Sequence, residues 1–181
     1  MWFYFFPHCI YHLTKWFPQN NRIKFRVVVF LLSVALLVPE FIVLSLPTTS
    51  RACDQPLLNI LVAGIVFLFM SVGFAIIFSL MDPVPRIVKI LFHLFGVGSL
   101  ILGLMSAFYT FEAPACSDST TELYYWCYVT SVLALITTGY FLLTVPFWLA
   151  NKTKPNLVLD WRRRSGICYE PVVYCSCVWH V

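Results

Sequence analysis

The chain has 181 residues, of which 60% are hydrophobic and only 11% are charged. A mean hydropathy of +0.83 excludes a soluble domain as the main body of the protein, because such a domain needs a far more polar surface. The net charge of +4 lies mostly in the segments that precede, connect and follow the apolar runs. It therefore indicates membrane topology and attraction to anionic lipid, and no nucleic-acid partner is expected.

Residues 1–26 precede the first long apolar run and form an aromatic and basic arm. The arm opens with aromatic residues at 2–6 and has neither a basic start nor a small-residue cleavage site, so it does not resemble a cleaved signal peptide. Two interpretations remain open. Either the rings lie in the headgroup layer, or the arm is irregular and interrupted by Pro7 and Pro18.

Four apolar runs follow, each long enough for a helix to cross a membrane. A helix rises about 1.5 Å per residue and the hydrocarbon core is about 30 Å thick, so about 20 apolar residues cross it. Backbone polar groups in lipid must bond within their own segment, which makes such runs helical. The sequence predicts an all-α, integral membrane four-helix bundle with short connections and with spans at 27–46, 57–81, 87–111 and 123–150.

Lysine and arginine residues gather on one side of the predicted bundle. They cluster before the first span, around the second connection and after the last span, whereas the other two connections hold only Arg51. The positive-inside tendency then places both termini in the cytoplasm and the connections 47–56 and 112–122 outside. A multi-pass protein of the secretory pathway or plasma membrane is expected.

Cys53 and Cys116 are the two cysteines of the outward connections, one in each. That compartment is oxidising, so a disulfide between them is predicted. The alternative is a pair of free thiols near the membrane surface. Cys127 lies within the fourth span and is expected to be a small buried hydrophobic side chain.

Residues 151–181 form a basic, cysteine-rich tail. Its arginines suit the anionic lipids of the inner leaflet, and its cysteines are candidates for palmitoylation. A zinc site that joins Cys9 and His12 to the tail is an alternative, but the spacing is not that of a standard finger, and no metal or cofactor is expected. The candidates for lipid binding or lipidation are Arg162, Arg163, Arg164, Cys168, Cys175 and Cys177.

Glu40 and His93 are the intramembrane polar residues of interest. An ionisable residue inside a membrane is a functional hypothesis by default, and Pro39 is expected to bend the helix beside the Glu40 carboxylate. The two depths differ by about 12 Å, so a direct pair is not expected. For His93, and for Lys89 one turn before it, the favoured interpretation is that the side chain extends to the inner interface.

Small residues recur at every fourth position in three of the predicted spans. Such stripes let helices approach closely, and packing within the bundle is the favoured interpretation. Gly96 and Gly98 are expected to mark a bend in the third span. The stripes consist of Ser71, Ala75 and Ser79, of Ser99, Gly103 and Ala107, and of Thr130, Ala134 and Thr138.

Two segments carry a family resemblance. Cys53 is followed by Gln55–Pro56 and an aliphatic run, and Cys116 is followed by Leu123–Tyr124 and further aromatic residues. In these features, residues 27–150 resemble the metazoan "transmembrane protein 272-like" family of small four-span membrane proteins. The resemblance implies four spans with outward cysteines before the second and fourth. It implies no activity.

The sequence lacks the motifs of an enzyme: it has no Gly-x-Ser-x-Gly elbow, no His-Glu-x-x-His and no phosphate-binding glycine loop. We therefore expect a non-enzymatic tetraspan protein that acts by lateral association with lipids, with other membrane proteins or with further copies of itself. The alternative is a subunit of an oligomeric channel or transporter, in which Pro39 and Glu40 line the outer mouth.

Overall fold

The computed structural model describes residues 1–16, 22–50, 53, 55–81 and 84–153. Within these ranges the regular secondary structure is entirely helical, and four of the helices are long and apolar enough to cross a membrane. The predicted all-α fold is therefore confirmed. The helices are α1 (Trp2–Trp16), α2 (Arg22–Ser45), α3 (Leu57–Leu80), α4 (Arg86–Phe111), α5 (Cys116–Ser119) and α6 (Thr121–Thr153).

The helix boundaries follow the local sequence closely. Pro56 and Pro85 stand immediately before α3 and α4, where a residue without a backbone N–H costs no hydrogen bond. The α2 helix begins five residues before the predicted start at Val27, because no glycine or proline interrupts the basic segment that leads into it. Pro39 lies inside α2.

The chain divides into two compact units, Met1–Ile136 and Thr137–Val181. The first unit holds α1 to α5 and the first half of α6. In the second unit the structure describes residues 137–153, which continue α6 and include Pro146. There the Thr144 hydroxyl donates a hydrogen bond of 2.7 Å to the backbone carbonyl of Phe141, one turn earlier.

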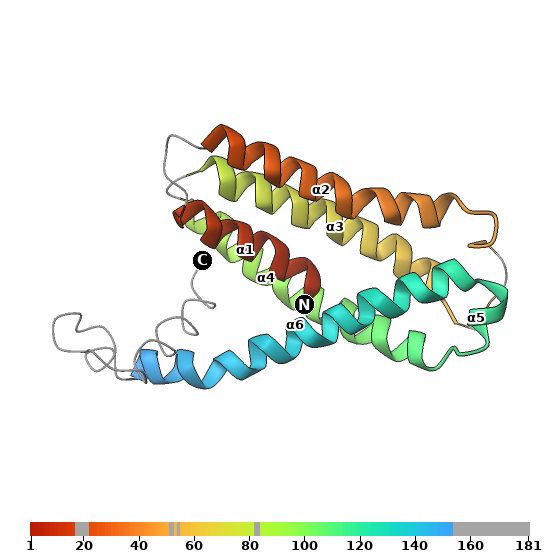
Figure 1. Cartoon of the computed structure of the whole chain (residues 1–181). Coiled ribbons are helices and arrows are strands. Elements are labelled where there is room, and N and C mark those ends of the chain that lie inside the picture. Colours follow the sequence, from red (N-terminus) through yellow and green to blue (C-terminus); the bar gives the residue numbers. More distant parts are fainter. Residues whose placement is uncertain (17–21, 51–52, 54, 82–83, 154–181) are drawn as a thin grey trace. The chain divides into compact units, whose positions relative to one another are not determined.

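The α1 helix is the main difference from the sequence prediction. It is a regular 15-residue helix that packs on α3 and α4 (Figure 1), so neither a headgroup-layer arm nor an irregular arm describes it. Pro7 lies inside the helix and is fully buried. Phe3, Tyr4 and Ile10 are also buried, and these positions together follow the spacing of one helix face.

Aromatic packing holds α1 against α4. The ring of Tyr4 stacks on that of Phe92 with 4.3 Å between centroids, and Phe92 is completely buried. Gly96, one turn further along α4, makes room for the same ring, because a Cβ atom there would lie 2.7 Å from a Tyr4 ring carbon. Gly96 thus serves close packing, where the sequence predicted a bend.

The remaining helices of the first unit pack through small side chains. The α2 helix lies on α3, and α3 on α4. Between α4 and α6, a Cβ atom on Gly103 would lie 3.0 Å from the Cβ of Ala134, and the hydroxyls of Ser106 and Ser131 are hydrogen-bonded at 2.8 Å. The predicted packing role of the small stripes within the bundle is confirmed for the buried members Ser71, Ala75, Ser99, Gly103, Ala107 and Ala134.

Candidate functional site

Glu40 lies on the inward face of α2. Its side chain is only 3% exposed, although most of the helix around it is exposed apolar surface. Val29, Ser33 and Val43 are buried on the same helix, and their spacing from Glu40 matches the helical period. The face of α2 that is turned toward the other helices therefore includes Glu40, and its carboxyl group lies in the interior of the first unit.

A cavity of about 30 Å³ surrounds the Glu40 side chain, inside the first unit. An internal water molecule needs about 10–15 Å³, so the cavity has room for one or two of them. Five helices contribute to its wall, which is mostly apolar. The lining residues are Phe3, Glu40, Ile60, Leu61, Gly64, Leu102, Gly103, Ser106, Trp126, Cys127, Thr130 and Ala134.

Two polar atoms in this cavity have no hydrogen-bond partner among the described residues: Oε2 of Glu40 and Nε1 of Trp126. The indole N–H of Trp126 lies near the carboxyl group of Glu40, but this direct contact does not have the geometry of a hydrogen bond. The two hydroxyls in the wall are already engaged, since Ser106 bonds to Ser131 and Thr130 donates to the carbonyl oxygen of Trp126 at 3.0 Å.

Among the described residues, no lysine or arginine lines the cavity. Arg51, in the connection that follows α2, lies outside the described residues. An ionised carboxylate without a cation or a full set of donors is strongly unfavourable in a low-polarity interior. With no lysine or arginine among the described residues of the wall, a neutralising ligand or a proton would remove this cost.

His93 belongs to different surroundings. Its Nδ1 is hydrogen-bonded to the hydroxyl of Tyr4 at 3.2 Å, which ties it to α1, although the residue as a whole is exposed. The sequence favoured simple extension to the interface and did not foresee this bond. Lys89, one turn earlier, places its Nζ 5.8 Å from the ring centroid of Tyr11. The cavity around Glu40 does not include His93.

Two further histidines lie on α1: the sequence analysis missed His8 and considered His12 only as a candidate zinc ligand. His8 is 3% exposed, and its Nε2 lies 3.1 Å from Nε2 of His12 one turn later. Burial, together with the nearby His12 and His93, lowers the pKa of His8 to about 3. Their spacing of four residues was visible in the sequence, but the burial comes from the contact with α3 and α4.

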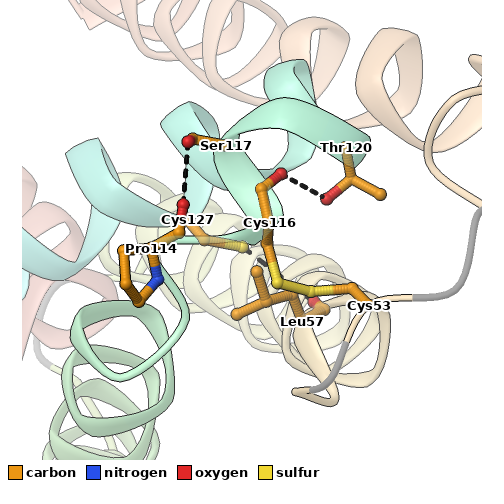
Figure 2. Close-up of a disulfide and its surroundings, with 7 residues drawn as sticks. All are labelled: Cys53, Leu57, Pro114, Cys116, Ser117, Thr120 and Cys127. Carbon is orange, nitrogen blue, oxygen red and sulfur yellow. Dashed lines mark hydrogen bonds between the residues drawn. A yellow bond between two sulfur atoms is a disulfide. The ribbon is translucent and has the colours of Figure 1, made fainter.

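A disulfide joins Cys53 to Cys116 at one end of the first unit, with 5.7 Å between their Cα atoms (Figure 2). The predicted pairing is thus present in the structure. Cys127 is 2% exposed, and its Sγ lies 3.9 Å from the carbonyl oxygen of Leu57 (Figure 2). It is the free, buried cysteine that the sequence predicted.

The remaining candidates fall where the structure gives no description. The six tail residues proposed for lipid binding or lipidation lie in 154–181, outside the described residues, and stay predictions. Within the described ranges, no three His, Cys, Asp or Glu side chains come together as a metal site. No family model, curated protein or solved structure matches the chain, and the resemblance to the "transmembrane protein 272-like" family also stays a prediction.

Proposed function

We propose that this multi-pass membrane protein is non-enzymatic and acts by lateral association with lipids and other membrane proteins. The observation that supports the proposal is the position of α2. This helix packs mainly on α3. Only 17% of its most apolar 18-residue stretch is buried, whereas the value for α3 is 39%. Most of the α2 surface is therefore available to lipid or to a partner helix.

The chemistry of the α2 surface fits this role. Lipid tails are as apolar as leucine, so helices in a membrane associate through packing and not through a hydrophobic driving force. Buried small residues such as Gly103 and Ala134 are already used inside the bundle, whereas α2 exposes large side chains such as Phe30, Leu31 and Ile42. A partner would pack against these large side chains in exchange for lipid.

A photo-crosslinking residue placed at Ile42 tests the proposal against a matched position at Ile101 of α4. The two side chains are 55% and 54% exposed, so lipid reaches both equally well. In native membranes we expect protein adducts from position 42 and lipid adducts from position 101. Lipid adducts alone at both positions would contradict a partner at α2.

The tail belongs to the same proposal. We place both termini in the cytoplasm of the plasma membrane or secretory pathway, where Arg162–Arg164 would meet an anionic leaflet. Each arginine near such a surface contributes about 1 kcal/mol. In nanodiscs, hydrogen exchange of the tail should be slower in anionic than in neutral lipid, and replacing all three arginines by glutamine should remove the difference. A difference that persists would refute the electrostatic attachment.

A channel or transporter subunit is the second candidate, and buried Glu40 favours it, because intramembrane acids often mark ion or proton pathways. The position of Glu40 decides where the path of such a channel or transporter would run. Glu40 faces the interior of its own unit, so a path along it would run within one chain and not between copies. Ion flux from liposomes tests this: the E40Q variant should be slowed, with Glu122→Gln as an exposed control. Equal flux in both would remove Glu40 from such a role.

A further inference from the structure

The cavity around Glu40 has a chemistry that lateral association does not use. We propose that it is an internal proton-binding site, in which Glu40 holds the proton and one bound water joins its carboxyl group to the indole N–H of Trp126. The proposal goes beyond the association role and does not depend on it. It rests on the burial of Glu40, on its open Oε2 and on the composition of the cavity wall.

The wall suits a proton better than a metal cation. Calcium and magnesium need about six oxygen ligands, whereas this cavity offers one carboxyl group and two hydroxyls that already have partners. The hydrogen of the Trp126 indole N–H carries a partial positive charge, which repels a cation but can donate a hydrogen bond to a water oxygen. A proton on Glu40 neutralises the carboxylate without any further ligand.

One water satisfies the two open groups together. The Trp126 N–H is a donor only, and a water oxygen accepts from it while exchanging a hydrogen bond with the Glu40 carboxyl group. The cavity of about 30 Å³ has room for that molecule. The reaction balances simply: a hydronium ion gives its proton to the carboxylate, and water remains.

The disulfide-bearing end of the first unit offers the shorter way in. Glu40 stands five residues before the end of α2 at Ser45, which is about 8 Å along the helix axis. On α6, Trp126 follows Glu122 by one turn, and Glu122 is exposed. The Oε2 of Glu122 accepts a hydrogen bond of 2.9 Å from the Thr48 hydroxyl. The exposed Glu122 side chain therefore marks a surface about one helical turn from the cavity wall.

Among the described residues, few titratable groups face the site. From α6, Cys127 lines the cavity, and α3 and α4 contribute no ionisable side chain to its wall. From α1, the amino group of Met1 lies beside Gly103 and donates to the carbonyl oxygen of Ala134 at 3.4 Å. Burial lowers the pKa of this amino group to about 6, so it supplies little positive charge at neutral pH.

Infrared difference spectroscopy of the full chain in nanodiscs tests the proposal. We expect the carbonyl stretching band of a protonated carboxyl group near neutral pH, absent in E40Q and retained in E122Q. A W126F variant should shift the band, because the water loses its second partner. A band that survives in E40Q, or none in the wild-type protein at any pH between about 5 and 8, would overturn the assignment.

A second measurement covers the case in which E40Q does not fold. A pH titration of the wild-type protein beside W126F should show one band that disappears on alkalinisation and differs in position between the two proteins. Bands of identical position in both would overturn the water bridge. The crosslinking pattern at Ile42 should be the same in wild type and W126F, so failure of this proposal and failure of lateral association are distinguishable.

Discussion

At Gly96, a missing side chain allows α1 to lie in the bundle, since the Tyr4 ring occupies the space of a Cβ atom. A side chain at position 96 would force the Tyr4 ring to move, and the hydroxyl of that ring is also hydrogen-bonded to His93. The sequence marked Gly96 as unusual in an apolar span but assigned it to a bend. The partner ring lies 92 positions earlier in the chain, and only the fold brings the two together.

The G96A variant should therefore loosen α1. The added methyl group would lie 2.7 Å and 2.9 Å from two ring atoms of Tyr4, and overpacking of this kind costs about 1–3 kcal/mol. Hydrogen exchange of residues 2–16 should become faster. The control is G73A on α3, where a Cβ meets nothing within 4 Å and exchange should not change. Equal exchange in the two variants would show that Tyr4 adapts without loss of packing.

Glu40 is a second residue that the sequence singled out without revealing what lies beside it. The sequence identified it as an unusual intramembrane acid and separated it correctly from His93. It could not identify Trp126 as the second polar group of the cavity, because Trp126 lies 86 positions away and resembles an interfacial aromatic residue. The meeting of the two follows from the rotation of α2 and α6 about their own axes.

At the scale of elements, α2, α3, α4 and α6 were predicted to within a few residues, because the thickness of a membrane sets a minimum apolar length. The α1 helix has 15 residues, too few to cross. Its aromatic content and its proline suggested an interfacial or irregular arm. The spacing of its buried residues Phe3, Tyr4, Pro7 and Ile10 was the signal for a packed helix.

Acidification should release α1. The pKa of His8 is about 3 in the packed helix and about 6.5 in water, so the released state binds more protons between these values. Packing is thus fully favourable above about pH 6.5 and weakens as the pH falls toward 3. A spin label on half-buried Cys9, with the other free cysteines replaced by serine, should become more mobile. The H8Q variant should lose this pH response, and an unchanged response would assign the effect to other groups.

At the scale of the whole molecule, the Cys53–Cys116 disulfide ties the connection before α3 to the one before α6. The two cysteines are 63 positions apart, and the loop-closure argument gives about 4 kcal/mol as an upper limit for the stabilisation. In a membrane the released chain stays helical and oriented, so a smaller effect is expected.

The Cys53–Cys116 disulfide also allows a test of how the protein is oriented in the membrane. With both termini in the cytoplasm, a membrane-impermeant reductant followed by an impermeant maleimide should label Cys53 and Cys116 in intact cells. The C53S/C116S variant is the control and should take up no label. Labelling that requires permeabilised cells would place this end on the cytoplasmic side and reverse the topology.

The sequence by itself determined that the chain is helical and that four of its helices are long and apolar enough to cross a membrane, and it predicted the pairing of Cys53 with Cys116. These properties depend on local hydropathy, on segment length and on the charge flanking each span. The tertiary structure alone decided that α1 enters the bundle, that Gly96 receives Tyr4 and that Glu40 shares a cavity with Trp126. In lipid, the hydrophobic effect does not choose between helix faces, so steric fit between distant side chains makes that choice.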